Sequence, residues 1–157
     1  MPSPRYVFTL ARGHTFRRRS IGFLHDLESA ELNALEHFNS LGEKYAQLVN
    51  SRFDHWLDCA IFDKYFHGWS EPEYKKYFVF KWEKKHIPQR FYGFLCHPLP
   101  ESDPSFETCV LVYYETKGDA TPRAVLDRVN SLRLNLDVTQ AISLIYPNYG
   151  GKTKWKN

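Results

Sequence analysis

The stretch from Lys81 to Tyr92 concentrates the side-chain types that bind and cleave RNA. Its basic and aromatic members are Lys81, Trp82, Lys84, Lys85, His86, Arg90, Phe91 and Tyr92. Lys and Arg can neutralise phosphate oxygens and stabilise the charge that develops on a phosphoryl group, without a metal. A His, a Tyr or a Lys of lowered pKa can move the proton of a ribose 2′-hydroxyl, and exposed rings can stack on bases. The stretch is therefore a candidate site for RNA chemistry.

The same stretch has a second interpretation that involves no ligand. Lysines on a strand at the edge of a sheet prevent pairing with other chains, and the run from Glu83 to Pro88 is typical of a solvated loop. Arg90 could pair with Glu83, and Tyr92 could belong to the core. Taken alone, the stretch leaves both interpretations open.

The chain lacks the motifs of several enzyme classes. It contains no GxGxxG, GxxxxGK[ST], GxSxG or HExxH sequence. Its seven His show no pair at metal-ligand spacing, and its three Cys form no CxxC pair. We therefore expect no metal site, no small-molecule cofactor and no disulfide framework.

The chain of 157 residues has room for one domain. Aromatic residues make up 17% of it, and each buried ring contributes a large apolar area to a core. No apolar run approaches the roughly 20 residues that span a bilayer, and the first residues lack the apolar core of a secretory signal. We expect one domain over 1–150 with a basic N-terminal arm, a flexible basic tail over 151–157, no membrane partner and a cytoplasmic location.

Charge is unevenly distributed along the chain, although the net charge is only +3. Residues 1–19 hold five Arg and no acidic residue, and residues 74–93 hold six basic residues and one acidic residue. Residues 20–73 and 94–116 are acidic overall. If the basic segments share one face of the fold, that face is suited to a polyanion such as RNA.

Two helices are predicted in the first half of the chain. The apolar residues of the first recur at helical spacing: Leu24, Leu27, Leu35, Phe38 and Leu41. Those of the second are Tyr45, Leu48, Val49, Phe53, Trp56, Leu57 and Ala60. Gly42 lies between the two stripes, and glycine tolerates the left-handed conformation that ends helices. The pattern predicts a helical hairpin over 21–40 and 43–60, with one long helix as the alternative.

The rest of the chain is predicted to be a sheet and a final helix. Runs rich in aromatic and β-branched residues indicate strands over 6–10, 74–82, 89–97 and 106–116. Short links favour antiparallel pairing of the last three strands. Thr121 and Pro122 suit the start of a helix over 123–134. The predicted fold is α+β: an N-terminal helical hairpin packs on a small antiparallel sheet, and a C-terminal helix closes the domain.

Three motifs and the order of the elements resemble those of one known family. Gln89 to Phe94 is similar to an arginine-plus-aromatic strand start, and Val110 to Lys117 to a hydrophobic strand that ends in lysine. Thr121 and Pro122, followed by an amphipathic helix, are similar to a segment that closes the fold. These features resemble the RelE/ParE-like toxin superfamily, and within it the HigB-like branch. The resemblance implies that residues 1–150 form one RelE-like domain.

The resemblance also implies a function. Such a protein is the toxin of a toxin–antitoxin pair, a metal-independent endoribonuclease that cleaves messenger RNA at the ribosome and is neutralised by an antitoxin protein. Carried onto this chain, Arg90 contacts the scissile phosphate region, Lys81, Lys84 and Lys85 bind phosphate or move a proton, and Tyr92 assists. The wider RNA-binding set is Lys117, His86, Arg17, Arg18 and Arg19. The superfamily also has gyrase-directed and inactive members, so the fold alone does not establish the activity.

Functions without catalysis are the alternative. The acidic helices and the many aromatic residues suit a phage or mobile-element protein that binds a host protein, because aromatic residues are enriched at interfaces. The basic N-terminal arm and tail suit a nucleic-acid binder, whose affinity would weaken steeply with salt.

Overall fold

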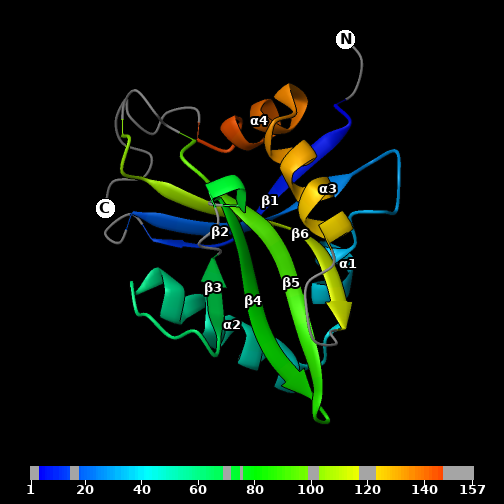
Figure 1. Ribbon diagram of the computed structural model, residues 1–157, viewed down its shortest axis with the longest axis vertical. Coiled ribbons are helices and arrows are strands. Elements are labelled where there is room, and N and C mark those ends of the chain that lie inside the picture. Colours follow the sequence, from blue (N-terminus) through cyan, green and yellow to red (C-terminus); the bar gives the residue numbers. More distant parts are fainter. Residues whose placement is uncertain are drawn as a thin grey trace.

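The structure is a computed structural model that describes residues 4–14, 18–68, 72–74, 76–98, 103–116 and 123–146 (Figure 1). Within these ranges the strands are β1 (Tyr6–His14), β2 (Arg19–Asp26), β3 (Phe66–Gly68), β4 (Tyr77–Lys84), β5 (Ile87–Cys96) and β6 (Glu107–Thr116). The helices are α1 (Ala34–Ser40), α2 (Glu43–Leu57), α3 (Arg123–Arg133) and α4 (Leu136–Ser143), with a 3₁₀ helix η1 (Pro72–Tyr74).

The six strands form one mixed sheet in the order β1-β2-β6-β5-β4-β3. β2 runs parallel to β6, and all the other neighbouring strands are antiparallel. The parallel pair places the N-terminal hairpin beside the last strand, so distant parts of the chain meet at the centre of the sheet. β1 and β2 cross β4 and β5 at a steep angle in Figure 1, so the sheet is strongly twisted.

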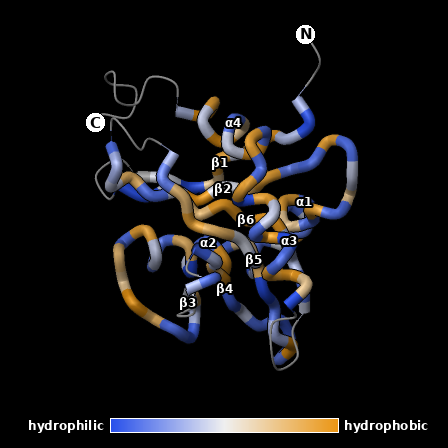
Figure 2. The backbone as a smooth tube through the Cα atoms, turned by 45° about the horizontal axis from the view of Figure 1, so that its top comes forward, coloured by the Kyte–Doolittle hydropathy of each residue, from blue (hydrophilic) through white to orange (hydrophobic). Residues whose placement is uncertain are grey.

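Helices pack on both faces of the sheet. α1 and α2 lie on one face, where their apolar residues meet Phe23, Phe80 and Phe91. α3 and α4 lie on the other face, against strand residues such as Leu24 and Phe94. The central strand β6 is buried on both sides, and Figure 2 shows a hydrophobic segment along it. None of the described helices is long and apolar enough to cross a bilayer.

The α+β class is confirmed, but the predicted arrangement of elements is wrong. Two strands precede the first helix, so the fold has no N-terminal helical hairpin. The sheet has six strands and is mixed, whereas a small antiparallel sheet was expected. α4 follows α3, so the domain does not end with a single closing helix. Of the helix predicted over 21–40, only the part from Ala34 is helical.

The error over the first predicted helix has a physical cause. β2 is a central strand with helices on both faces, so Ile21, Phe23 and Leu24 are all buried. Such a strand is a continuous apolar run, which periodicity cannot distinguish from a buried helix. Leu27, which belongs to the apolar stripe of the predicted helix, is 55% exposed and lies just after the strand.

The later elements are confirmed, with shifted ends. α2 ends at Leu57, three residues before the predicted end, and α3 ends at Arg133. β4, β5 and β6 lie where strands were predicted, and they pair in antiparallel fashion. The short first strand extends to His14. The predictions for Thr121, Pro122 and the tail over 151–157 lie outside the described residues.

Gly93 lies where two strand backbones approach closely. The register between β5 and β6 shifts between Tyr92 and Gly93, as at a β-bulge. A Cβ atom at position 93 would lie 1.9 Å from the carbonyl oxygen of Val110. Position 42 offers the opposite case, because a Cβ atom on Gly42 would have nothing within 4 Å.

We expect Gly93→Ala to lower the free energy of unfolding by roughly 3 kcal/mol or more, because β5 and β6 must separate around the added methyl group. Gly42→Ala is the matched control and should change this free energy by less than about 1 kcal/mol. Urea unfolding followed by circular dichroism measures both. Similar losses in the two variants would contradict the close approach at Gly93.

Candidate functional site

Lys81 on β4 and Arg90 on β5 are directly opposite each other in the sheet. Opposite residues of antiparallel strands project from the same face, with Cβ atoms about 4.5–5.5 Å apart. Both side chains are half-buried, and neither forms an ion pair with any other described residue. The structure therefore brings together two of the predicted site residues, and an anion bound between them would offset their repulsion.

A cleft of about 580 Å³ lies beside this pair, between the β4 edge and α2. We call it the cationic cleft. Its basic lining residues are Arg52 of α2, Lys64 of the segment before β3, Lys81 and Arg90. Glu83 is the one acidic residue among the described residues that line it, and Tyr65 and Trp82 contribute rings. The excess of positive charge makes this cleft a candidate site for phosphate groups.

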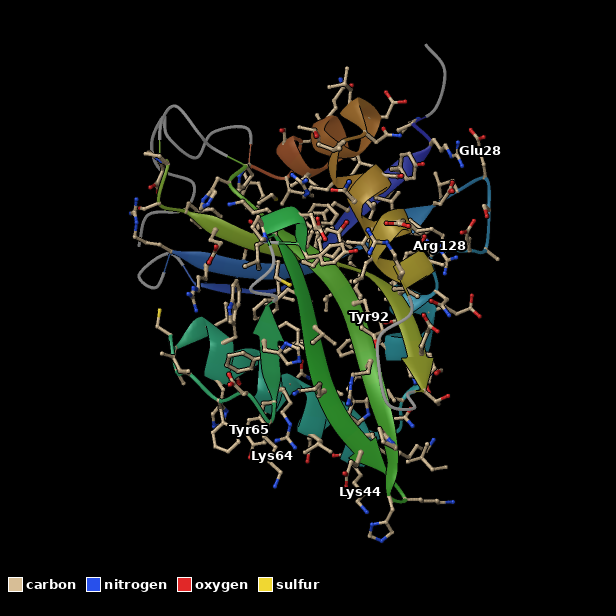
Figure 3. All side chains as sticks on the ribbon, in the orientation of Figure 1. Glu28, Lys44, Lys64, Tyr65, Tyr92 and Arg128 are labelled. Carbon is tan, nitrogen blue, oxygen red and sulfur yellow. The ribbon has the colours of Figure 1, made fainter. Side chains whose placement is uncertain are left out.

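Two contacts hold Arg52 in the cleft. Its Nε donates a hydrogen bond to the Lys81 carbonyl at 3.3 Å, and its guanidinium carbon lies 3.5 Å from the centre of the Tyr65 ring. The planar guanidinium is thus oriented by a cation–π contact while keeping further N–H donors. Figure 3 shows Lys64 and Tyr65 at the same corner of the molecule, below β3.

His67 shares the face of the sheet that carries Lys81 and Arg90. It is paired with Val79, and Val79 and Lys81 lie two residues apart on β4. Residues two apart on a strand project from the same face. His67 Nδ1 lies 2.8 Å from the Gly68 carbonyl oxygen, a contact in which the protonated Nδ1 donates and Nε2 carries the lone pair.

Burial lowers the pKa of Lys81, Arg90 and His67. For Lys81 the neighbouring Arg90 lowers the pKa further, because a second positive charge disfavours protonation, and the charge of Asp63 opposes this shift. The pKa of Arg90 is lowered by burial alone, against the opposing effects of Tyr92 and Glu83. The pKa of His67 is lowered first by burial and also by the charges of Lys81 and Arg90, against the opposing effects of the Gly68 carbonyl and Asp63. A His of lowered pKa is neutral at pH 7 and can accept a proton.

The other predicted catalytic residues lie apart from this group. Lys84 projects from the opposite face, where its Nζ lies 5.4 Å from the centre of the Tyr45 ring on α2. Lys85 and His86 form the exposed turn between β4 and β5. Tyr92 is 1% exposed and belongs to the core, so its ring is not accessible to a bound nucleotide.

Arg18 and Arg19 are engaged in contacts within the protein. Arg18 forms an ion pair with Asp103 and donates a hydrogen bond to Ser105 at 2.8 Å. Arg19 donates to the Trp56 carbonyl at 2.6 Å, and its guanidinium lies 4.4 Å from the centre of the Trp56 ring. These contacts tie β2 to the segment before β6 and to the end of α2.

Sequence reasoning missed three of the basic residues at this site. All three lie outside the basic stretch: Arg52 on α2, Lys64 in the segment before β3, and His67 on β3. No local signal identifies them, because the approach of Arg52 and Lys64 to β4 depends on how α2 crosses the sheet, and that of His67 on the pairing of β3 with β4. The predictions for Arg17 and Lys117 lie outside the described residues.

The chain matches no family model, no curated protein and no solved structure. The resemblance to the RelE/ParE-like toxins therefore stays a prediction. Among the residues that the structure describes, no group of three or more His, Cys, Asp or Glu side chains is placed to hold a metal ion.

The turn between β4 and β5 contains two strained residues. Lys85 and His86 have φ angles of 51° and 67°, the pattern of the two central residues in a type I′ turn. Asn and Gly adopt this conformation at lower cost than Lys and His. We expect Lys85→Asn combined with His86→Gly to raise the free energy of unfolding by about 1–2 kcal/mol. A less stable variant in urea unfolding would contradict this interpretation.

The coupling between Lys81 and Arg90 can be measured directly. We expect Arg90→Ala to raise the pKa of Lys81 towards its ordinary value, because a neighbouring positive charge is removed. NMR titration of ¹³C-methylated lysines measures this pKa, and Lys81→Arg assigns the signal. Arg128→Ala is the matched control, because Arg128 lies on α3, away from Lys64 and Tyr65 of the cationic cleft (Figure 3), and does not line that cleft. An unchanged Lys81 titration in Arg90→Ala would show that the two charges do not interact.

Proposed function

We propose that the protein is a metal-independent endoribonuclease that binds single-stranded RNA in the cationic cleft, and that it acts as the toxin of a toxin–antitoxin pair on messenger RNA at the ribosome. The observation that carries the proposal is the convergence of Arg52, Lys64, Lys81 and Arg90 on one cleft, without an ion pair to any described residue. The ribosome, the messenger RNA and the antitoxin come from the family resemblance.

The electrostatics favour a polyanion as the ligand. Half-buried cations that repel one another gain most from a ligand with closely spaced negative charges, such as a nucleic-acid backbone. Burial strengthens the contacts that Arg52, Lys81 and Arg90 would make with phosphate, because the local dielectric is lower than in water. Lowered pKa values of this kind are common at functional sites.

The side chains around Lys81 match the demands of RNA cleavage. The ribose 2′-oxygen attacks the adjacent phosphorus, the bond from phosphorus to the 5′-oxygen breaks, and the products are a 2′,3′-cyclic phosphate and a 5′-hydroxyl. In this mechanism His67 Nε2 takes the proton of the 2′-hydroxyl, and the Lys81 ammonium gives a proton to the leaving 5′-oxygen. Arg90 and Arg52 stabilise the charge that develops on the phosphoryl oxygens.

Part of the expected chain order also supports the proposal. β1 includes the expected first strand over 6–10, and two helices, three antiparallel strands and a helix come later in the chain. β2, which takes the place of part of the expected first helix, and β3 and α4 are additions to the order on which the resemblance to the RelE/ParE-like toxins rests.

We expect the wild-type protein to arrest the growth of a bacterium that expresses it, and to cleave single-stranded RNA in the presence of EDTA. Arg90→Ala should reduce the cleavage rate by about 100-fold, because one donor to the developing phosphoryl charge is lost. Arg128→Ala removes the same charge from α3 and should cleave like the wild type. Gel analysis of labelled RNA measures the rates.

Two outcomes would count against the nuclease. One is equal toxicity and cleavage by Arg90→Ala at equal expression. The other is loss of cleavage when EDTA is added, which would contradict a mechanism without metal. Product ends other than a 2′,3′-cyclic phosphate would contradict the assigned roles of His67 and Lys81.

A second candidate is a protein that binds a host protein without catalysis. Ile61 and Phe62, which are 90% and 42% exposed, favour this candidate. This function would be favoured over the nuclease if the purified protein neither binds nor cleaves RNA and copurifies with one stoichiometric protein partner.

A further inference from the structure

A second cleft, of about 860 Å³, adjoins the cationic cleft, and Lys81 lines both. We call it the aromatic cleft, because its lining includes the rings of Trp56, Phe62, Phe66 and Phe78. His67 also lines it, so the proposed base of the cleavage reaction borders this space. The two clefts thus meet at Lys81, one rich in cations and the other rich in rings.

Phe62 ends a stack of planar groups that begins in the cationic cleft. The Arg52 guanidinium lies 3.5 Å from the centre of the Tyr65 ring. The Phe62 ring centre lies 4.2 Å from the Tyr65 ring centre, with the two planes at 24°. Two groups this close to one ring cannot share a face, so Arg52 and Phe62 lie on opposite faces of Tyr65. The stack leads from one cleft to the other.

The outer face of Phe62 is accessible to a ligand. Phe62 is 42% exposed although Tyr65 covers one of its faces. Its carbonyl oxygen accepts hydrogen bonds from the N–H groups of Tyr65 at 2.9 Å and Phe66 at 3.1 Å. The ring is therefore held on an ordered turn, and a planar group that stacks on it would lose little further freedom.

We propose that the aromatic cleft is a nucleobase subsite, in which one base of a single-stranded RNA stacks on Phe62 while the adjoining phosphate lies on Lys81 and Arg90. This inference rests on the proposed function and deepens it. A base in a duplex is already stacked, so the subsite selects single strands. The neighbouring cations favour an RNA over an apolar peptide as the occupant, because only the RNA supplies negative charge next to a ring.

The test uses a non-cleavable oligonucleotide of about six nucleotides, with 2′-O-methyl riboses and 2-aminopurine at one position at a time. Anisotropy measures its affinity, and fluorescence at saturation reports stacking of the modified base. We expect quenching at one position in the wild type. Phe62→Ala should lose this quenching and bind about tenfold more weakly. Phe62→Tyr should retain both properties. Leu136→Ala, which truncates an 83% exposed apolar residue on α4 that lines neither cleft, is the control and should bind and quench like the wild type.

An abasic residue at the quenched position separates stacking from a structural effect. It should weaken binding to the wild type by the same factor as Phe62→Ala, and it should weaken binding to Phe62→Ala no further. Additive losses would show that Phe62 acts through the fold and would overturn the subsite.

Failure of the subsite and failure of the proposed function give different results. If the wild type binds the oligonucleotide and Arg90→Ala weakens binding, but Phe62→Ala binds and quenches like the wild type, only the base subsite is overturned. If the wild type binds no RNA at all, both the proposed function and the base subsite are overturned. Loss of a protein partner from Phe62→Ala, with RNA binding intact, would assign this surface to a protein and likewise overturn the subsite.

Discussion

The parallel pairing of β2 with β6 is the constraint on which the rest of the fold depends. It joins residues 19–23 to residues 107–111, and both strands are buried on both faces of the sheet. Parallel strands need a long crossover, so α1, α2 and three strands all lie between the two partners in the chain. The crossover lays α2 across one face, and this position lets Arg52 reach the Lys81 carbonyl at the sheet edge.

A side chain continues the pairing of β6 where β2 has ended. The amide of Asn33, just before α1, accepts from the Tyr114 N–H at 2.8 Å and donates to the Tyr114 carbonyl at 3.2 Å. The backbone N–H and carbonyl of Tyr114 therefore have hydrogen-bond partners past the point where β2 ends. β6 can therefore support β5 as far as the pair of Gln89 with Thr116, and β5 in turn holds Arg90 opposite Lys81.

Charges in this protein fall into two kinds of environment. Several arginines join distant elements through carboxylates: Arg5 with Asp26 on β2 at 3.0 Å, and Arg12 on β1 with Asp54 on α2 at 2.6 Å. The cations of the cationic cleft have no such partner among the described residues, and burial lowers the pKa of Lys81. Paired charges of the first kind position strands and helices, whereas half-buried unpaired charges are suited to a ligand that brings its own negative charge.

The sequence by itself determined α2, the strands β4 to β6 and α3, because each buries an apolar stripe or a run of rings whose spacing is local. It also placed Lys81 and Arg90 on neighbouring strands, since their hairpin is formed by adjacent residues. Only the tertiary structure decided that residues 19–26 form a strand, because burial on both faces removes the alternation that marks one. It alone brought Arg52 and Phe62 to the two clefts, since those contacts depend on where α2 and the following turn cross the sheet edge, and no pattern in the chain encodes that crossing.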